Sequence, residues 1–480
     1  MDIGIATIAA FAEKRSPKDL TLADLDQVAD YMETNYVVDP LKSFLTVAFP
    51  NAGFLNAAYN RQPEKRTEYA QKILRCYRPE TPITDERCVF TGKPAVAVSL
   101  DLKDELPPGR TYRQHVPLTT GVGVINFHAE GNPGLPISGE ALLALHALPL
   151  GCAKVAGRLL GVHSSDPDIT LSYAKAFLEE NREAVQLARE GGEKKLPEQP
   201  RRALTLLIDN LLQADRLRQE EVEEGNLLSI TAYHFTNSGQ GADLHIYHLP
   251  LEVFDFIQAA MNPIYRNAWD KVCARGWEIS STRRQEEGFT PRFNVVYEDL
   301  FRLPENANQF IRRYFLRVPA RTRLKGDPRA SYSLRSEADL VSWNLTELFL
   351  RKVVSMKQER INAIRDLGDV LAEYIHAEND KRFFNSFLMA RNYAALRSAL
   401  VRANVGMLRR GQPPAITFDS FIAVFEEGEE LPYADWRLAR DLLLIRLVEQ
   451  LYQLGWIKAN LDDLPDVNNE STVSDGEEVL

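Results

Sequence analysis

Apolar residues recur at helical spacing along most of this chain. Near the N-terminus, Thr21 and Asp24 have the pattern of a capping box, and the apolar positions that follow lie three or four residues apart. The same spacing predicts further helices, over residues 64–77, 138–148, 166–190 and 201–218. A polar stretch, GGEKKLPEQP, separates the last two and predicts a surface loop.

Short β-like runs interrupt this helical pattern. Residues 88–136 are punctuated by Pro and Gly and contain two apolar runs, at 96–98 and 122–125. Further on, LLSITAYHF and ADLHIYHL flank the turn-rich segment NSGQG, which predicts a β-hairpin. The first two thirds of the chain therefore mix helices with short strands.

Beyond residue 330 the pattern is helical almost throughout. Helices are predicted over residues 336–378, 380–410, 417–426 and 434–457, and the final twenty residues are polar and acidic. The sequence predicts an α+β fold in three parts. These are a mixed helical and β domain over 1–335, a C-terminal helical bundle over 336–460 and an acidic disordered tail over 461–480.

The charge, the cysteine content and the lack of long apolar runs disfavour a disulfide-rich, secreted or membrane protein. The 480 residues carry a net charge of −10, but seven acids lie within residues 460–480, so the rest of the chain carries −3 and leaves room for local basic surfaces. The four cysteines are too few and too scattered for a disulfide scaffold. The first residues lack the basic start and cleavage site of a signal peptide, and no run is long enough to span a membrane. We expect a reduced, cytoplasmic protein without membrane contact.

Catalytic and metal-binding motifs are absent from the sequence. It contains no phosphate-binding glycine loop, no HExxH and no GxSxG. Cys88 and Thr91 have the spacing of half a zinc knuckle whose second cysteine is replaced, and Ser138 and Ala141 stand where a second pair would be expected. Zinc needs four cysteine or histidine donors, and only distant Cys76, His115 and His128 are at hand, so we expect no bound metal and no cofactor.

The three histidines of the predicted hairpin do not suggest a metal site either. His245 and His248 are three residues apart, so the alternation of a strand puts them on opposite faces. We expect His234, His245 and His248 to be half-buried and hydrogen-bonded rather than to ligate a metal.

Two segments have the chemistry of nucleic-acid binding. The first is the loop FPNAGFLNAAYN, whose candidate DNA contacts are Asn51, Phe54, Asn56 and Asn60. Asn pairs with adenine in the major groove and donates to minor-groove acceptors, and an apolar tip can wedge between base pairs. Asn is also common in turns, so the residues alone favour a capped turn that covers a core.

The second segment is a run of basic residues. Arginine clusters suit phosphate contacts, although such a run is equally compatible with a solvated face. Within the predicted 380–410 helix, spacings of 11 and 7 would put three more arginines on one face. The candidate phosphate contacts are Arg312, Arg313, Arg317, Arg321, Arg323, Lys325, Arg391, Arg402 and Arg409.

Several short motifs in the N-terminal third occur in the order seen in one known family. They are DIGIA (2–6), PLKSFL (40–45), FPNAGF (49–54), RCVFTG (87–92), INF (125–127) and ALPLG (147–151). Over about residues 1–185 the chain resembles the large subunit of the type I-B CRISPR Cascade effector, the Cst-one branch of the Cas-eight family. Many relatives carry paired cysteines where this chain has Thr91, Ser138 and Ala141, which implies that a zinc knuckle has lost its metal here.

The resemblance implies a function without catalysis. Such a subunit sits beside the crRNA 5′ handle with the backbone and handle-binding subunits, examines the PAM duplex, helps to open the double-stranded target and recruits a helicase–nuclease or a transposition adaptor. It makes Asn51, Phe54, Asn56 and Asn60 the expected PAM contacts. It also raises the prospect of a small subunit translated internally from Met356, whose copies would bind the displaced single strand; a methionine that packs within a helix is the equal alternative.

Two other functions remain open from the sequence. One is a stand-alone DNA- or RNA-binding protein outside CRISPR, which would bind nucleic acid without guide RNA or partner subunits. The other is an unrecognised hydrolase that uses Cys88 or the histidines, which the missing motifs disfavour.

Overall fold

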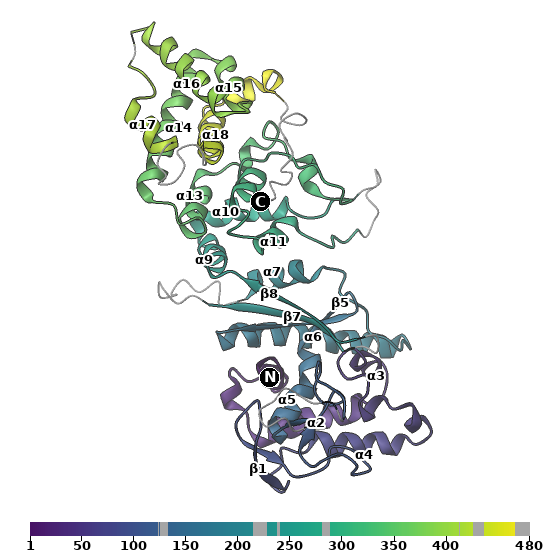
Figure 1. Cartoon of the computed structure of the whole chain (residues 1–480). Coiled ribbons are helices and arrows are strands. Elements are labelled where there is room, and N and C mark those ends of the chain that lie inside the picture. Colours follow the sequence, from purple (N-terminus) through teal and green to yellow (C-terminus); the bar gives the residue numbers. More distant parts are fainter. Residues whose placement is uncertain are drawn as a thin grey trace. The chain divides into compact units, whose positions relative to one another are not determined.

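The computed structural model describes residues 1–122, 124, 133–214, 228–237, 241–280, 289–411, 413–425 and 436–465. It is 55% helical with small antiparallel sheets, in agreement with the predicted α+β class. The chain forms two compact units, Met1–Leu249 and Pro250–Leu480 (Figure 1). None of the described helices is long and apolar enough to cross a membrane.

Helices make up much of the first unit. The predicted capping box is present, because the Thr21 amide donates to Asp24 Oδ2 at 2.8 Å and the Asp24 amide donates to Thr21 Oγ1 at 3.4 Å. The helices predicted at 64–77, 138–148 and 166–190 are confirmed with slightly different ends. The helix predicted at 201–218 is present but ends at Gln213, and residues 215–218 lie outside the described residues. The helices are α1 (Asp2–Phe11), α2 (Leu22–Asn35), α3 (Leu41–Leu45), α4 (Pro63–Leu74), α5 (Gly139–Ala147), α6 (Pro167–Glu190) and α7 (Ala203–Gln213).

The first unit also contains three antiparallel sheets. Two are small pairs, β1 (Ile83–Arg87) with β2 (Pro94–Val96), and β3 (Arg110–Thr111) with β4 (Leu135–Pro136). The third has the strand order β5-β6-β7-β8, and α1 and α6 pack against β6. Its strands are β5 (Ala153–Val155), β6 (Arg158–Ser164), β7 (Ile230–Thr236) and β8 (Asp243–Leu249).

The predicted hairpin is confirmed as β7 and β8. His234 lies directly opposite His245, while His248 is opposite Thr231, which puts His245 and His248 on opposite faces as expected. His234 is buried and its Nε2 is 3.0 Å from the Val155 carbonyl oxygen. His245 and His248 are exposed, so the expectation that all three would be half-buried is wrong, and the arrangement does not bring the three histidines together.

The second unit is mainly helical. Its helices begin with α9 directly after β8, and α12 continues into a short π-helix, η5 (Ile311–Phe315). They are α9 (Leu251–Ala260), α10 (Pro263–Ala274), α11 (Val295–Leu300), α12 (Ala307–Phe310), α13 (Trp343–Lys352), α14 (Gln358–Glu378), α15 (Lys381–Leu388), α16 (Tyr393–Leu408), α17 (Phe418–Phe425), α18 (Trp436–Gln453) and α19 (Trp456–Ala459).

The boundary expected near residue 335 falls inside this second unit. Phe349 of α13 stacks on Phe310 of α12 with ring centres 5.2 Å apart, and its edge meets Phe256 of α9 at 5.3 Å. These aromatic contacts join residues 250–335 to the C-terminal helices in one interior. The hydrophobic pattern was read correctly as helical, but it did not reveal that α13 shares its core with the preceding segment.

Three expectations differ from the structure or lie outside its description. The predicted 336–378 helix is two helices, because Ser355 adopts a left-handed conformation (φ 55°) between α13 and α14. Of the β-like run 122–125, only residues 122 and 124 are described, and neither lies in a strand. The motif at 125–127 and residues 466–480 of the expected disordered tail lie outside the described residues.

Candidate nucleic-acid interface

The asparagine loop is built from two consecutive 3-10 helices, η2 (Gly53–Leu55) and η3 (Ala57–Arg61). Asn51, Asn56 and Asn60 are exposed, whereas Phe54 is completely buried, with an exposed fraction of 0%. The loop therefore presents its amides to solvent and is held from below by one aromatic side chain.

Phe54 is part of the core of the first unit. Its ring meets the edges or faces of three others, at centre-to-centre distances of 5.8 Å to Tyr36, 5.1 Å to Tyr69 and 5.7 Å to His146. The expectation that Phe54 contacts DNA is therefore corrected: a side chain with no exposed surface cannot wedge a base step, and it anchors the loop instead.

Gly53 lets the loop approach α4 closely. A Cβ atom at this position would lie 2.5 Å from the Tyr69 ring, closer than real side-chain atoms come. Tyr69 is itself buried, so the ring has little room to move. The backbone at Gly53 therefore packs directly against an aromatic ring.

The three exposed asparagines differ in their hydrogen bonds. Asn56 Oδ1 accepts from the Ala58 amide at 2.9 Å and so caps η3. Arg66, which is 7% exposed, donates to Asn60 Oδ1 and, at 3.3 Å, to the Asn56 carbonyl oxygen. The Asn51 side chain makes no hydrogen bond to the described part of the chain.

These bonds determine which base edges the loop can read. Asn56 and Asn60 use their Oδ1 atoms internally and keep their Nδ2 donors, which suits minor-groove acceptors such as adenine N3 and thymine O2. Asn51 keeps both its donor and its acceptor, which a bidentate contact to adenine requires. The turn interpretation and the binding interpretation are therefore compatible, because different atoms serve each.

The basic run after α12 does not form one phosphate-binding surface. Arg317 is completely buried: its guanidinium forms an ion pair with Glu337 at 2.7 Å and lies 3.7 Å from the centre of the Tyr332 ring. Burial raises the pKa of Tyr332 to about 12, so it is neutral beside this charge. The expectation that Arg317 contacts phosphate is corrected, because its charge is used inside the fold.

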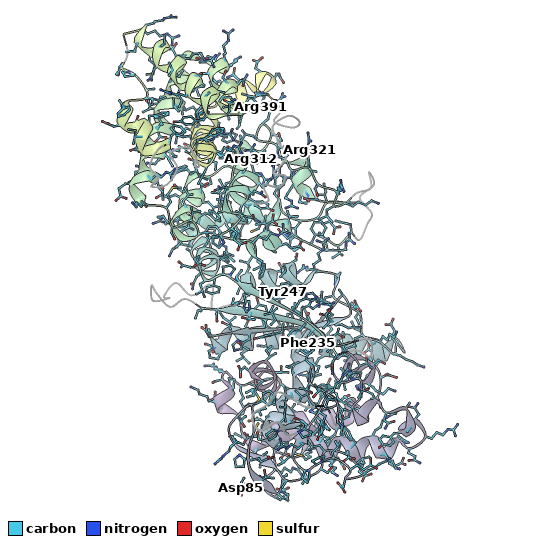
Figure 2. All side chains as sticks on the ribbon, viewed as in Figure 1. Asp85, Phe235, Tyr247, Arg312, Arg321 and Arg391 are labelled. Atoms are coloured by element: carbon cyan, nitrogen blue, oxygen red, sulfur yellow. The ribbon has the colours of Figure 1, made fainter. Side chains whose placement is uncertain are left out.

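Arg312 and Arg313 are also engaged with the protein. Arg312 Nη1 lies 3.4 Å from Asp441 Oδ2 of α18, and Arg313 Nη1 donates to the Val318 carbonyl oxygen at 3.2 Å. Arg321, Arg323 and Lys325 are exposed. Figure 2 marks Arg312 and Arg321 in the second unit.

The predicted stripe of C-terminal arginines is shorter than expected. The 380–410 segment is two helices, because Asn392 caps α16 by accepting from the Ala395 amide at 2.8 Å. Arg391 precedes that cap and is not on α16, so it does not share a helix face with the other two arginines. Arg402 and Arg409 remain exposed, on α16 and at its C-terminal cap, seven residues apart and on one face.

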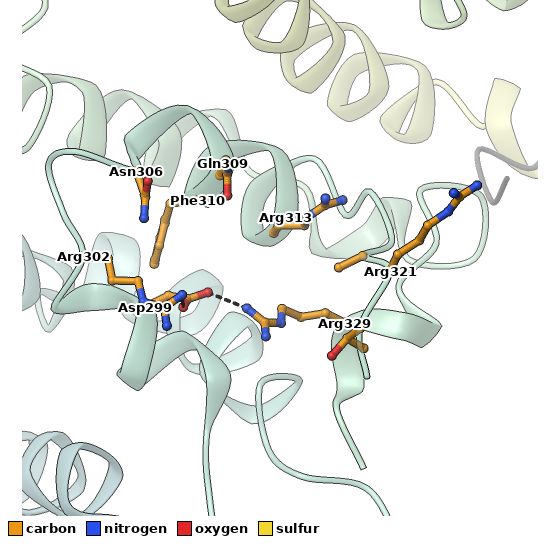
Figure 3. Close-up of a pocket in the computed structure, with 10 residues that line it drawn as sticks. Asp299, Arg302, Asn306, Gln309, Phe310, Arg313, Arg321 and Arg329 are labelled. Carbon is orange, nitrogen blue, oxygen red and sulfur yellow. Dashed lines mark hydrogen bonds and ion pairs between the residues drawn. The ribbon is translucent and has the colours of Figure 1, made fainter. Parts of the chain in front are cut away.

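A cleft brings three residues of the basic run together with two residues that the sequence did not single out, Arg302 and Asp299. Arg313 and Arg321 line it with Arg329, Arg302 and Asp299 (Figure 3). Arg329 pairs with Asp299 at 2.7 Å and with Asp327 at 2.9 Å. Arg302 lies ten residues before Arg312, where the basic run begins, with no basic residue between, so the basic run carried no signal that pointed to it.

The structure brings the two half-knuckle segments together. Thr91 Oγ1 lies 3.1 Å from Ser138 Oγ, and Cys88 is buried beside them. Burial acts to raise the pKa of the Cys88 thiol, but hydrogen bonds with Thr91 and Ser138 outweigh it and lower the pKa below its usual value. Among the described residues, no three His, Cys, Asp or Glu side chains are grouped to hold a metal ion; His128 lies outside them.

Comparisons with known proteins give no further guide to this interface. No family model, no curated protein and no solved structure matches the chain.

Proposed function

We propose that this chain is the non-catalytic large subunit of a type I-B Cascade surveillance complex. The observation that carries the proposal is the asparagine loop, which exposes three amides while Phe54 fixes it to the core. In such complexes the protein reads a short flanking duplex and base pairing with the guide reads the rest of the target. Asn51, Asn56 and Asn60 are the proposed PAM contacts.

The second unit contributes phosphate contacts in this proposal. Arg321, Arg323, Lys325, Arg402 and Arg409 are exposed and positively charged. Arginine and lysine side chains of this kind bind the nucleic-acid backbone without reading sequence and make binding depend on salt. They would hold the opened duplex or the displaced strand while the loop examines the flank.

The partners follow from the same proposal. They are crRNA, the backbone and handle-binding subunits, and a helicase–nuclease or a transposition adaptor that acts after target binding. Met356 is half-buried in the connection between α13 and α14, so a product that starts there would begin just before α14 and contain the helices that follow. We therefore keep an internally translated small subunit in the proposal.

Guide dependence tests this function. We expect the isolated chain to bind DNA weakly and without sequence preference, and the complex assembled with guide RNA and the proteins encoded beside it to bind a complementary target at least about 1,000-fold more tightly. Gel-shift titrations of both samples against matched and scrambled duplexes measure this. Equally tight, sequence-specific binding by the chain alone would favour a stand-alone nucleic-acid-binding protein, and turnover of a substrate would favour a hydrolase.

A further inference from the structure

A small basic cleft lies in the second unit, around the end of α11 and the start of α12. Its volume is about 210 Å³, and ten residues line it. Four of them are arginines and one is an aspartate; Asp327, which pairs with Arg329, adds a second negative charge, so the site has a surplus of two positive charges. Figure 3 shows Arg302 and Asp299 near each other and Arg321 extending away from Asp299.

Asp299 holds two of the four guanidinium groups in place. Its Oδ2 accepts from Arg329 Nη1 at 2.7 Å, and its Oδ1 lies 3.4 Å from Arg302 Nη1. The buried Tyr314 hydroxyl donates to the same carboxylate at 2.6 Å and fixes it. Burial raises the pKa of Tyr314 well above its usual value, so this donor stays protonated. The charges at this side of the cleft are therefore positioned before any ligand arrives.

Neutral donors complete the lining. The side-chain amides of Asn306 and Gln309 are exposed and make no hydrogen bond to the described residues. Amide and guanidinium donors together are the groups that bind phosphate oxygens in proteins. The Phe310 ring is already stacked on Phe349, so it closes the floor and is not free to stack on a base.

We propose that this cleft binds a single phosphate group. Its surplus of positive charge disfavours cations, and its polar lining disfavours apolar ligands. Sites for drug-sized ligands occupy about 300–1,000 Å³, so a cleft of about 210 Å³ suits one phosphate and its immediate ester better than a whole nucleotide. The site is new relative to the sequence, because Arg302, Asn306 and Gln309 carried no signal there.

The source of this phosphate rests on the proposed function. If the chain binds nucleic acid as proposed, the phosphate is a phosphodiester of the nucleic-acid backbone. A free phosphate monoester has the same chemistry. Competition distinguishes the two, because short duplex DNA should displace inorganic phosphate from the cleft if the backbone is the ligand. If only glucose 6-phosphate displaces it and DNA does not, the source is a small metabolite.

The test uses the full chain and two matched variants. Arg302→Gln removes a charge from the cleft at a side chain that is 68% exposed, so the fold should persist. Arg266→Gln removes a charge from a side chain on α10 that is 51% exposed and lies 3.7 Å from Asp270. Inorganic phosphate binding is measured by calorimetry, and the salt slope of DNA binding by gel shift.

We expect Arg302→Gln to weaken phosphate binding about tenfold and to reduce the DNA salt slope by about one, with Arg266→Gln within about twofold of the unchanged chain. Arg302→Lys should fall between the two, because a point charge replaces the planar fork. Absence of phosphate binding, or equal losses in both glutamine variants, would overturn the inference. The proposed function can fail separately. If DNA binding does not depend on the guide but Arg302→Gln still binds phosphate more weakly than Arg266→Gln, the phosphate site is supported and the proposed function is not.

Discussion

Replacing Phe54 with alanine is expected to lower the free energy of unfolding of the first unit by about 4 kcal/mol. Phe54 is fully buried among Tyr36, Tyr69 and His146, and its removal leaves a cavity that those packed rings cannot fill. Urea titration, followed by far-ultraviolet circular dichroism, measures the change in the free energy of unfolding. The loop should also lose its fixed position, so the variant should bind target without regard to the flank.

A control in the same unit separates burial from the loss of an aromatic group. Phe90 is 38% exposed, and Phe90→Ala should cost less than about 1 kcal/mol. If Phe54→Ala were as stable as Phe90→Ala and affected DNA binding alone, Phe54 would be a contact residue rather than an anchor, and the account of the loop given above would be wrong.

Lowering the pH from 7 to 5 should destabilise the first unit by about 4 kcal/mol, roughly 2 kcal/mol for each of two buried histidines. Burial lowers the pKa of His115 to about 3 and that of His146 to about 4. Both rings are neutral in the folded protein, whereas in the unfolded chain they take up protons below about pH 6.5. Stability is therefore complete above that pH and falls as the pH decreases toward the folded values.

The hydrogen bonds of the two rings explain why they stay neutral. His115 Nε2 lies 2.8 Å from the Leu100 carbonyl oxygen while its Nδ1 accepts from the Tyr112 amide at 3.3 Å. His146 Nδ1 is 2.8 Å from the Leu142 carbonyl oxygen, and its ring stacks on Phe49 at 4.8 Å. Among the described residues no carboxylate forms a hydrogen bond with either ring; burial lowers the pKa of His115 and outweighs nearby Asp101, which acts to raise it.

His146→Asn provides the control for the pH experiment. Its Nδ2 can replace the bond to Leu142, and it does not titrate, so the slope of stability between pH 7 and 5 should fall by about half whatever the variant's stability at pH 7. Chemical denaturation at several pH values measures the slope. An unchanged slope would show that other groups control the acid response.

Local sequence patterns predicted many of the elements. The Thr21–Asp24 capping box, the hairpin of β7 and β8 and five helices of the first unit depend on neighbours within a few residues, and the structure contains them. These helices are α2, α4, α5, α6 and α7. The break between α15 and α16 was missed although Asn392 is a strong N-cap residue. Apolar periodicity on both sides of a short break outweighed that single signal.

Local sequence patterns could not predict which side chains are buried by residues that are distant in the chain. Phe54 lies in a loop of Asn, Ala and Gly, but its partners Tyr36 and His146 are 18 and 92 residues away in the chain. Arg317 lies within an exposed-looking basic run, yet Glu337 and Tyr332 enclose it. Residue types indicated the chemistry of both segments, and only the fold shows which side chains that chemistry leaves at the surface.

Reading of the flanking duplex is best measured on the assembled complex with its guide. A library of targets that share one protospacer and differ in the bases beside it gives the affinity for each flank. We predict that the affinity of the complex varies at least about tenfold among the flanks. When Asn51→Ala and Asn56→Ala are combined, the affinity should be equal for all flanks. The control Asn267→Ala, which changes an exposed residue on α10, should retain the variation. Flank-independent binding by the unchanged complex, or full discrimination by the double variant, would contradict the account.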